Sequence, residues 1–310
     1  MLLRILFITA LFYLIPNILG YNHAQAYFYF AEEEEAAEPE KVDEDKKQPS
    51  KSIQRSDIKI VKPVSSFEQQ KQDLTHYLSG SKTQSIKAGD SEYIIIEESS
   101  STQNNKGVAI LIPDWQQGVA NPKAMNFLRK NLPDAGWSTI SVQSPNKPMN
   151  YPSVALTKEE RIEQNKAALM PYQNELKSLV TAVMEKAKNY PGIFLVITEG
   201  SQAAILIDLY KNNQDLLPAA LITLSAGMYS ELENDTFAKN IAMSELPVLD
   251  LILKKDRNSV LENAMLRKKY ATKELKVYYR QKYLHNMVPG YYPEQTLLTE
   301  VNGWLKTIGW

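Results

Sequence analysis

From Glu92 to the end of the chain, short apolar runs alternate with segments in which apolar residues recur at helical spacing. The segments predicted as strands are 93–96, 107–112, 137–142, 193–197, 219–224, 247–253 and 275–279, and most of them are apolar throughout. The helical segments are 125–132, 158–188 (with a break expected at Pro171), 202–210, 229–243, 259–270 and 293–308. Continuous apolar runs of this length are typical of strands buried on both faces. The alternation predicts an α/β fold, a mostly parallel sheet with helices on both faces.

The sharpest turn in this pattern is Thr198-Glu-Gly-Ser201, between the apolar run 193–197 and the helical segment 202–210. The carboxyl ends of parallel strands lie at one edge of a sheet, where ligands bind. Glycine readily takes positive φ, so we expect Gly200 at the apex of this turn. Ser201 would then lie in the first turn of the helix, where its hydroxyl would cap backbone N–H groups.

Three segments carry a resemblance to the α/β-hydrolase superfamily that covers roughly residues 92–310. They are Gly107-Val-Ala-Ile-Leu-Ile-Pro-Asp-Trp115, Leu132-Pro-Asp-Ala-Gly-Trp137 and Thr198-Glu-Gly-Ser-Gln-Ala-Ala204. Within this superfamily, the chain resembles an uncharacterised family of exported bacterial α/β-hydrolase-like proteins, a domain of unknown function. The resemblance implies an α/β-hydrolase-like sheet with its site at the strand–turn–helix.

In this superfamily, the nucleophilic serine lies at that turn in a G-x-S-x-G motif, called the nucleophile elbow. Here the nucleophile position falls on Gly200, and Ser201 comes one place later. Thr198 and Gln202 take the places of the two flanking glycines. Ser201 could act as the nucleophile if the turn were one residue longer. Glu199 comes just before the apex, where a carboxylate could act as a base or bind a cation.

The resemblance also implies an acid and a histidine, in the order serine, acid, histidine along the chain. The strand predicted at 247–253 is followed by Asp256, at the place expected for the acid. Asp256 could instead cap the helix that begins near Ser259. His285 follows the last apolar run, 275–279, at the place expected for the histidine.

The loop after the run 107–112 should donate one N–H group to the oxyanion hole. Pro113 has no N–H, so Asp114 or Trp115 would have to donate it. The backbone N–H of Gln202 would be the second donor if Ser201 were the nucleophile. Alternatively, the loop is a turn in which Trp115 packs over the edge of the sheet.

The N-terminus has the features of a signal peptide. An apolar stretch, 5–19, follows Arg4, and Ala24-Gln-Ala26 is a small-x-small cleavage site. We therefore predict a signal peptide at 1–26, a disordered acidic linker at 27–65 and an α/β-hydrolase-like domain at 66–310. The expected location is the periplasm or the medium, and an uncleaved membrane anchor is the alternative.

The 310-residue chain has a formal net charge of −1 and no basic stripe, so we expect no nucleic-acid partner. It contains no cysteine, which excludes disulfides, thiolate catalysis and cysteine-ligated metals. It also lacks the glycine-rich loops that bind phosphates. We expect neither a metal nor a cofactor.

Two functions follow from these observations. The first is a ligand-binding or scaffold protein of the envelope that keeps the fold and the cleft without a nucleophile. Its partner would be a small or lipid-like ligand or another envelope protein. The second is an active esterase or lipase-like hydrolase with Ser201 as nucleophile, His285 as base and Asp256 as the orienting acid. The glycine at the nucleophile position favours the first.

Overall fold

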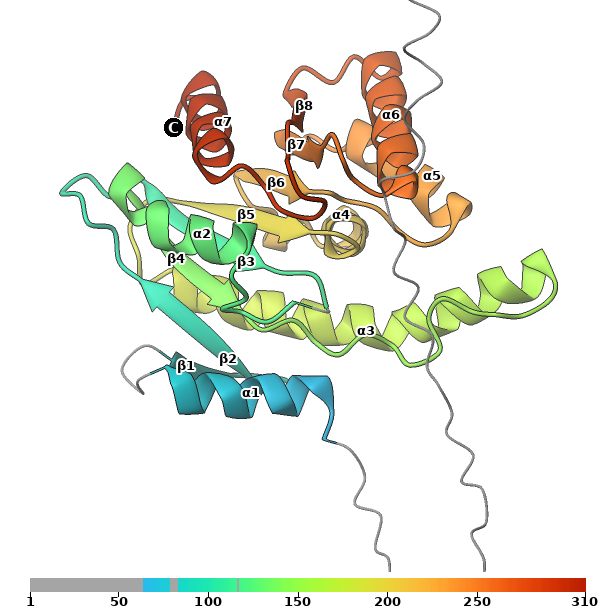
Figure 1. Ribbon diagram of the computed structural model, residues 1–310, viewed down its shortest axis with the longest axis horizontal. Helices are drawn as coiled ribbons and strands as arrows, with labels where there is room; N and C mark the ends of the chain where they lie inside the picture. Colours follow the sequence, from blue (N-terminus) through green and yellow to red (C-terminus); the bar gives the residue numbers. More distant parts are fainter. Residues whose placement is uncertain (1–63, 79–82, 116) are drawn as a thin grey trace, which may run out of the picture. The chain divides into compact units, whose positions relative to one another are not determined.

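The computed structural model describes residues 64–78, 83–115 and 117–310 (Figure 1). The predicted signal peptide (1–26) lies outside the described residues, and so does the predicted linker (27–65) up to residue 63. The described helices and strands all belong to one unit, Lys62–Trp310. In this part of the chain, no helix combines the length and the apolar character needed to cross a membrane.

An eight-stranded sheet forms the centre of the unit, with the strand order β1-β2-β4-β3-β5-β6-β7-β8. The strands are β1 (Thr83–Ala88), β2 (Ser91–Glu98), β3 (Gly107–Ile112), β4 (Trp137–Val142), β5 (Ile193–Glu199), β6 (Ala220–Leu224), β7 (Val248–Leu253) and β8 (Tyr279–Leu284). β2 is antiparallel to both β1 and β4, and all the other neighbours pair in parallel. The predicted class, α/β with a mostly parallel sheet, is confirmed.

Helices cover both faces of the sheet (Figure 1). They are α1 (Ser66–Tyr77), α2 (Ala124–Asn131), α3 (Lys158–Ala187), α4 (Gln202–Asn212), α5 (Glu231–Met243), α6 (Asn258–Lys273) and α7 (Glu294–Thr307), with short 3₁₀ turns at Pro133–Ala135 and Gln214–Leu216. The apolar side chains of α2 and α7 pack with Leu195 and Ile197 of β5. Those of α3, α4 and α5 pack with Val196. Successive residues of β5 therefore contact opposite layers, as expected for a strand buried on both faces.

The strand register determines which loops meet at the edge of the sheet. Ile112 of β3 pairs with Thr198 of β5, and Glu199 of β5 pairs with Leu224 of β6. These three parallel strands therefore end next to one another. The loops that follow them lie side by side at the edge where α/β proteins bind their ligands.

The break predicted at Pro171 does not occur, because α3 runs without interruption through 30 residues. Proline lacks the N–H that would bond to the carbonyl of Ala167. Both Ala167 and Pro171 are exposed, so water can bond to that carbonyl instead. The helix therefore tolerates the proline on its solvent side.

The last strand was predicted at 275–279, but β8 spans Tyr279–Leu284. Leu275 and Val277 are exposed, although their apolar character indicated a strand. The strand β8 carries polar residues because those on each of its two faces bond to charged partners. Tyr279 and Gln281 bond to Asp250 of β7, while Arg280 and Lys282 pair with a glutamate of α7. His285 consequently comes immediately after the strand.

Candidate functional site

The turn between β5 and α4 is the centre of the candidate site. Gly200 has a φ of 61°, in the left-handed region that glycine enters without steric cost, and its N–H donates to the Leu224 carbonyl at 3.0 Å. Ser201 comes next, and its side chain does not cap α4. Its Oγ donates to the Gly227 carbonyl at 3.2 Å, and the residue is 3% exposed. The Ser201 hydroxyl is therefore bonded to the backbone that follows β6.

Asp114, in the loop after β3, fills the space in front of Gly200. A Cβ atom added to Gly200 would lie 2.6 Å from Asp114 Oδ2 and 2.7 Å from Asp114 Cγ. Both separations are far shorter than a non-bonded contact. A nucleophilic side chain at position 200 therefore has no room while Asp114 keeps this position.

The Asp114 carboxylate also faces the amides that an active hydrolase would use. In this fold, the oxyanion hole consists of the N–H after the nucleophile and an N–H from the loop after β3. Ser201 and Trp115 hold those two positions here, and the backbone N–H of each favours the charged form of Asp114 and lowers its pKa. The Asp114 carboxylate therefore faces the two N–H groups that correspond in position to an oxyanion hole.

Two carboxyl groups with raised pKa values lie at this turn. Burial raises the pKa of Asp114 to about 6, against the opposing effect of the two N–H groups. Burial likewise raises the pKa of Glu199 to about 7, and the nearby Asp114 carboxylate adds to this increase. Both groups therefore titrate near neutral pH, well above the ordinary range of aspartate and glutamate.

A cleft of about 510 Å³ opens at this edge of the sheet. Its charged lining residues are the acids Asp114, Glu199 and Asp256 and the bases Lys123, Lys255 and Arg257. The volume is typical of a site for a small molecule. Equal numbers of positive and negative side chains make the cleft strongly polar without a large net charge.

Asp256 lies in the cleft after β7, but its carboxylate makes no hydrogen bond with His285. It accepts hydrogen bonds from the Ser225 hydroxyl and, at 2.8 Å, from the backbone N–H of Arg257. Ser225 also lies 2.6 Å from the hydroxyl of Tyr292. Ser225 has a φ of 47°, which is rare for serine, and sequence reasoning missed it. A hydroxyl residue directly after an apolar strand was the available signal.

The three residues of the predicted catalytic triad are not brought together. His285 has an exposed side chain and makes no hydrogen bond or ion pair among the described residues. Ser201 bonds to a backbone carbonyl, and Asp256 bonds to Ser225. The next residue, Asn286, is buried and holds the loop through two hydrogen bonds with the backbone of Lys255.

Trp115 packs over the sheet edge in an aromatic cluster. Its ring lies 5.6 Å from that of Tyr151, 5.4 Å from that of Tyr172 and 6.4 Å from that of Tyr229. Gln202 is fully buried, and its side-chain amide donates to the hydroxyl of Tyr172. The side of the turn next to Trp115 is thus filled by packed aromatic rings.

The family model described as "Protein of unknown function (DUF3530)" matches residues 22–307. The chain belongs to this family. A search of curated proteins gives no match. Membership in DUF3530 agrees with the domain of unknown function that the sequence resembles.

Solved structures show the fold of this DUF3530 chain independently. Est1E from Butyrivibrio proteoclasticus is 11% identical, with a TM-score of 0.51 over 74% of this chain and 100% of that one. A putative α/β hydrolase from Agrobacterium tumefaciens is 10% identical, with a TM-score of 0.51 over 73% and 95%. An alpha-beta serine hydrolase homologue from Coxiella burnetii is 14% identical, with a TM-score of 0.49 over 75% and 100%. The two structures with a TM-score of 0.51 show that the fold is that of the α/β-hydrolases, as the resemblance implied.

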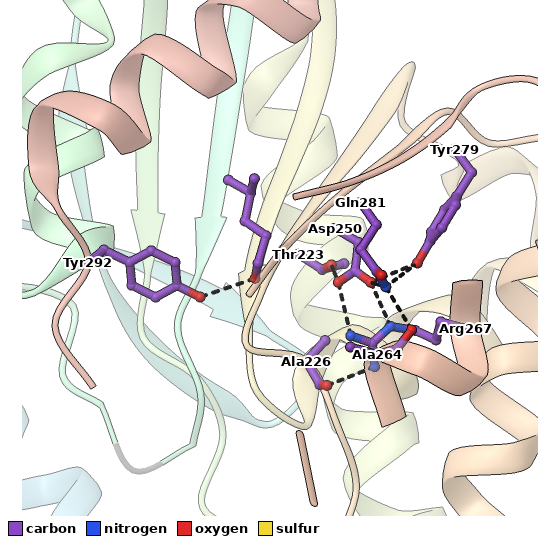
Figure 2. A network of polar contacts seen from close by, with 9 residues as sticks. Thr223, Ala226, Asp250, Ala264, Arg267, Tyr279, Gln281 and Tyr292 are labelled. Atoms are coloured by element: carbon purple, nitrogen blue, oxygen red, sulfur yellow. Dashed lines mark hydrogen bonds and ion pairs between the residues drawn. The ribbon is translucent and has the colours of Figure 1, made fainter. Parts of the chain in front are cut away.

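Beside the cleft, a buried ion pair joins three strands and a helix (Figure 2). Asp250 of β7 and Arg267 of α6 are both fully buried, and Arg267 donates to the Asp250 carboxylate through Nε at 2.8 Å and Nη2 at 3.0 Å. Thr223, Tyr279 and Gln281 donate to the same carboxylate at 2.8–2.9 Å. Arg267 holds the pKa of Asp250 below its usual value despite the burial.

The ion pair also supports the loop next to the turn. Arg267 donates through Nη1 to the carbonyl of Ala226 at 2.9 Å, as Figure 2 shows. The next residue, Gly227, accepts the Ser201 hydroxyl and donates its N–H to the Gly200 carbonyl at 3.3 Å. The signal for this network in the sequence was Asp250, a charged residue inside the predicted strand 247–253. A charge buried in a strand requires a partner of opposite charge.

Replacing Glu199 by glutamine should stabilise the protein at alkaline pH. The folded-state pKa of Glu199 is raised, so the charged form destabilises the folded state above about pH 7 and this cost disappears as the pH falls towards about 5. The variant should therefore gain on the order of 1–3 kcal/mol at about pH 8 and little at about pH 5. Urea unfolding at both pH values measures this, with the exposed Glu262→Gln as control. An equal effect at both pH values would contradict the expectation.

Proposed function

We propose that this protein binds a small molecule in the cleft at Gly200 and does not hydrolyse acyl esters. The observation that carries the proposal is the Asp114 carboxylate, 2.6 Å from where a Gly200 Cβ would be. Serine-type hydrolysis needs a hydroxyl at that apex, a base beside it and free amides for the oxyanion. In this chain a carboxylate takes the place of the hydroxyl and faces the amides.

The surroundings of His285 and Ser201 also support a binding role. A general base must reach the proton that it removes, at about 2.6–3.2 Å or through one water. His285 is exposed and has no hydrogen-bonded partner among the described residues, and the Ser201 hydroxyl donates to a backbone carbonyl. The cleft nevertheless keeps a volume suited to a small molecule and a charged lining.

A fluorophosphonate probe, which labels activated serines, tests the proposal. We expect no labelling of the folded protein from Tyr27 onwards, under conditions in which a known serine hydrolase is labelled fully. Ser201→Ala, Ser225→Ala and His285→Ala serve as matched variants. Labelling that is lost in both Ser201→Ala and His285→Ala would refute the proposal. It would instead support the serine esterase with Ser201, Asp256 and His285.

We also propose that the protein is exported. The support is the N-terminal sequence, with an apolar stretch before Ala24-Gln-Ala26. Expressed at full length in a Gram-negative host, the protein should appear in the periplasmic fraction with Tyr27 as its first residue by mass spectrometry. Leucine at both Ala24 and Ala26 should prevent cleavage. Recovery of the intact chain from the cytoplasm would contradict export.

A further inference from the structure

Two carboxylates at the turn form no ion pair with a described residue, and the N–H groups of Trp115 and Ser201 offset the burial of Asp114 only in part. The Glu199 side chain makes no hydrogen bond or ion pair within the described part of the chain. Asp114 Oδ1 is buried, and no described group lies within hydrogen-bonding distance of it in suitable geometry. Both side chains line the cleft, and their charges repel each other. A buried carboxylate without a partner is costly unless a ligand supplies the missing positive charge.

The same cleft also holds the exposed side chain of Arg257, which has no partner among the described residues. The backbone N–H of Arg257 bonds to Asp256, but its guanidinium makes no hydrogen bond or ion pair to a described residue. Arg257 is close enough to lower the pKa values of both Asp114 and Glu199, yet it pairs with neither. Lys255, next to it in the cleft, donates to the Met287 carbonyl at 3.3 Å.

We infer that the cleft binds a small zwitterion, with its ammonium group at Asp114 and Glu199 and its carboxylate or phosphate at Arg257 and Lys255. The inference rests on the proposed binding function and names the class of ligand. An ammonium group has three N–H donors and can bond to both carboxylates at once. Arginine binds carboxylates and phosphates through two parallel hydrogen bonds.

Other ligand classes fit this lining less well. A purely cationic ligand would be repelled by Lys123, Lys255 and Arg257, and a purely anionic one would leave Asp114 and Glu199 without a partner. A metal ion usually needs more ligands, and the described residues contain no group of three or more His, Cys, Asp or Glu that could hold one. A zwitterion complements both signs of charge without adding net charge to the cleft.

Binding should also release protons. The charged and titratable groups that face the two carboxyls are Lys123, Lys147, Tyr172, Asp256, Arg257 and Tyr292. A bound ammonium favours the charged forms of Asp114 and Glu199 and so lowers their pKa values. Affinity should therefore rise between about pH 5 and about pH 8, with protons released to the buffer.

Isothermal titration calorimetry on the mature protein tests the inference with three zwitterions of increasing length, β-alanine, γ-aminobutyrate and ε-aminocaproate. Hexylamine and caproate match the last of these but carry one charge each. We expect at least one of the three zwitterions to bind. If ε-aminocaproate is the one that fits, it should bind at least about tenfold more tightly than hexylamine and than caproate. Buffers with different ionisation enthalpies should reveal the released protons.

Variants show which end of the zwitterion lies where. Glu199→Gln should weaken zwitterion binding at least about tenfold and should abolish part of the proton release. Arg257→Gln should weaken zwitterion binding to a similar extent but should leave the proton release in place. The exposed Glu262→Gln should change neither.

Two sets of results would overturn the inference. Hexylamine or caproate alone binding as tightly as the zwitterion of its length would refute the zwitterion while leaving a binding function. Binding of calcium or magnesium instead of a zwitterion would also refute the inference, and so would the absence of binding by all three zwitterions. Fluorophosphonate labelling of Ser201, by contrast, would refute the proposed function itself.

Discussion

Replacing Asp250 by alanine should lower the free energy of unfolding by about 3–5 kcal/mol, because it leaves the Arg267 guanidinium buried without its counter-charge. Thr223, Tyr279 and Gln281 would lose their acceptor in the same change. Urea unfolding followed by circular dichroism at neutral pH measures the loss. A change below about 1 kcal/mol would mean that water or a rearranged side chain replaces the carboxylate.

Asp235→Ala is the matched control for this prediction. Asp235 also pairs with a cation and a tyrosine, Lys239 at 2.6 Å and Tyr270 at 2.8 Å, but it does so at the surface. A surface pair contributes little, so the control should cost far less. Arg267→Ala combined with Asp250→Ala should cost clearly less than the sum of the two single changes, because the pair acts as a unit.

The ion pair also predicts acid sensitivity. The pKa of Asp250 is lower in the folded than in the unfolded chain, so its stabilisation is complete above about pH 5 and is lost as the pH falls through the folded-state value. Asp250→Asn should therefore unfold with a smaller dependence on pH in the acid range than the wild type. If Asp250→Asn and the wild type unfolded with the same dependence on pH in the acid range, carboxyl groups other than Asp250 would be responsible for the acid sensitivity.

Gly200→Ala should lower the free energy of unfolding by about 2–4 kcal/mol, through two separate effects. A side chain is disfavoured at a φ of 61°, and the new methyl would lie 2.6 Å from Asp114 Oδ2. Gly290→Ala separates these effects, because Gly290 has a φ of 77° and its Cβ would meet no atom of the described residues within 4 Å. The control should lose about 1–2 kcal/mol.

Asp114→Ala should rescue part of the Gly200→Ala defect. Removing the carboxylate leaves room for the methyl group, so the double variant should keep the conformational cost alone. We expect a coupling of at least about 1 kcal/mol between the two sites in a double-mutant cycle. Strictly additive effects would mean that Asp114 moves aside without cost, and they would weaken the argument that it excludes a nucleophile.

Most of the sheet could be predicted from the sequence, because β3, β6 and β7 are buried on both faces and are therefore mainly apolar. β4 is also fully buried, and its apolar residues alternate with serine and threonine, which strands accommodate well. The edge strands could not. β1 has a mixed exposure pattern, and β8 carries polar side chains that bond to Asp250 and Glu300. Those partners lie elsewhere in the chain, so only the tertiary structure explains the polar residues of β8.

The candidate site followed the same division. The turn at Gly200 could be located because strand, glycine and helix are adjacent in the sequence. The position of Asp114 could not, since it depends on how closely the loop after β3 approaches that turn. Asp114 and Trp115 were expected as donors of an N–H, and the sequence did not show that the side chain of Asp114 lies against Gly200. Local sequence patterns predict helices and strands, whereas contacts between loops become known only from the tertiary structure.

The contact between Asp114 and Gly200 also bears on how such a chain could change over evolutionary time. A serine introduced at position 200 meets the carboxylate, and a smaller residue at position 114 alone leaves the apex without a hydroxyl. Under the proposed binding function, neither single substitution would be enough to place a free hydroxyl at the apex. Both positions would have to change together, and a base would also have to reach the new hydroxyl, so the contact makes the gain of serine-type hydrolysis a change of several coupled steps.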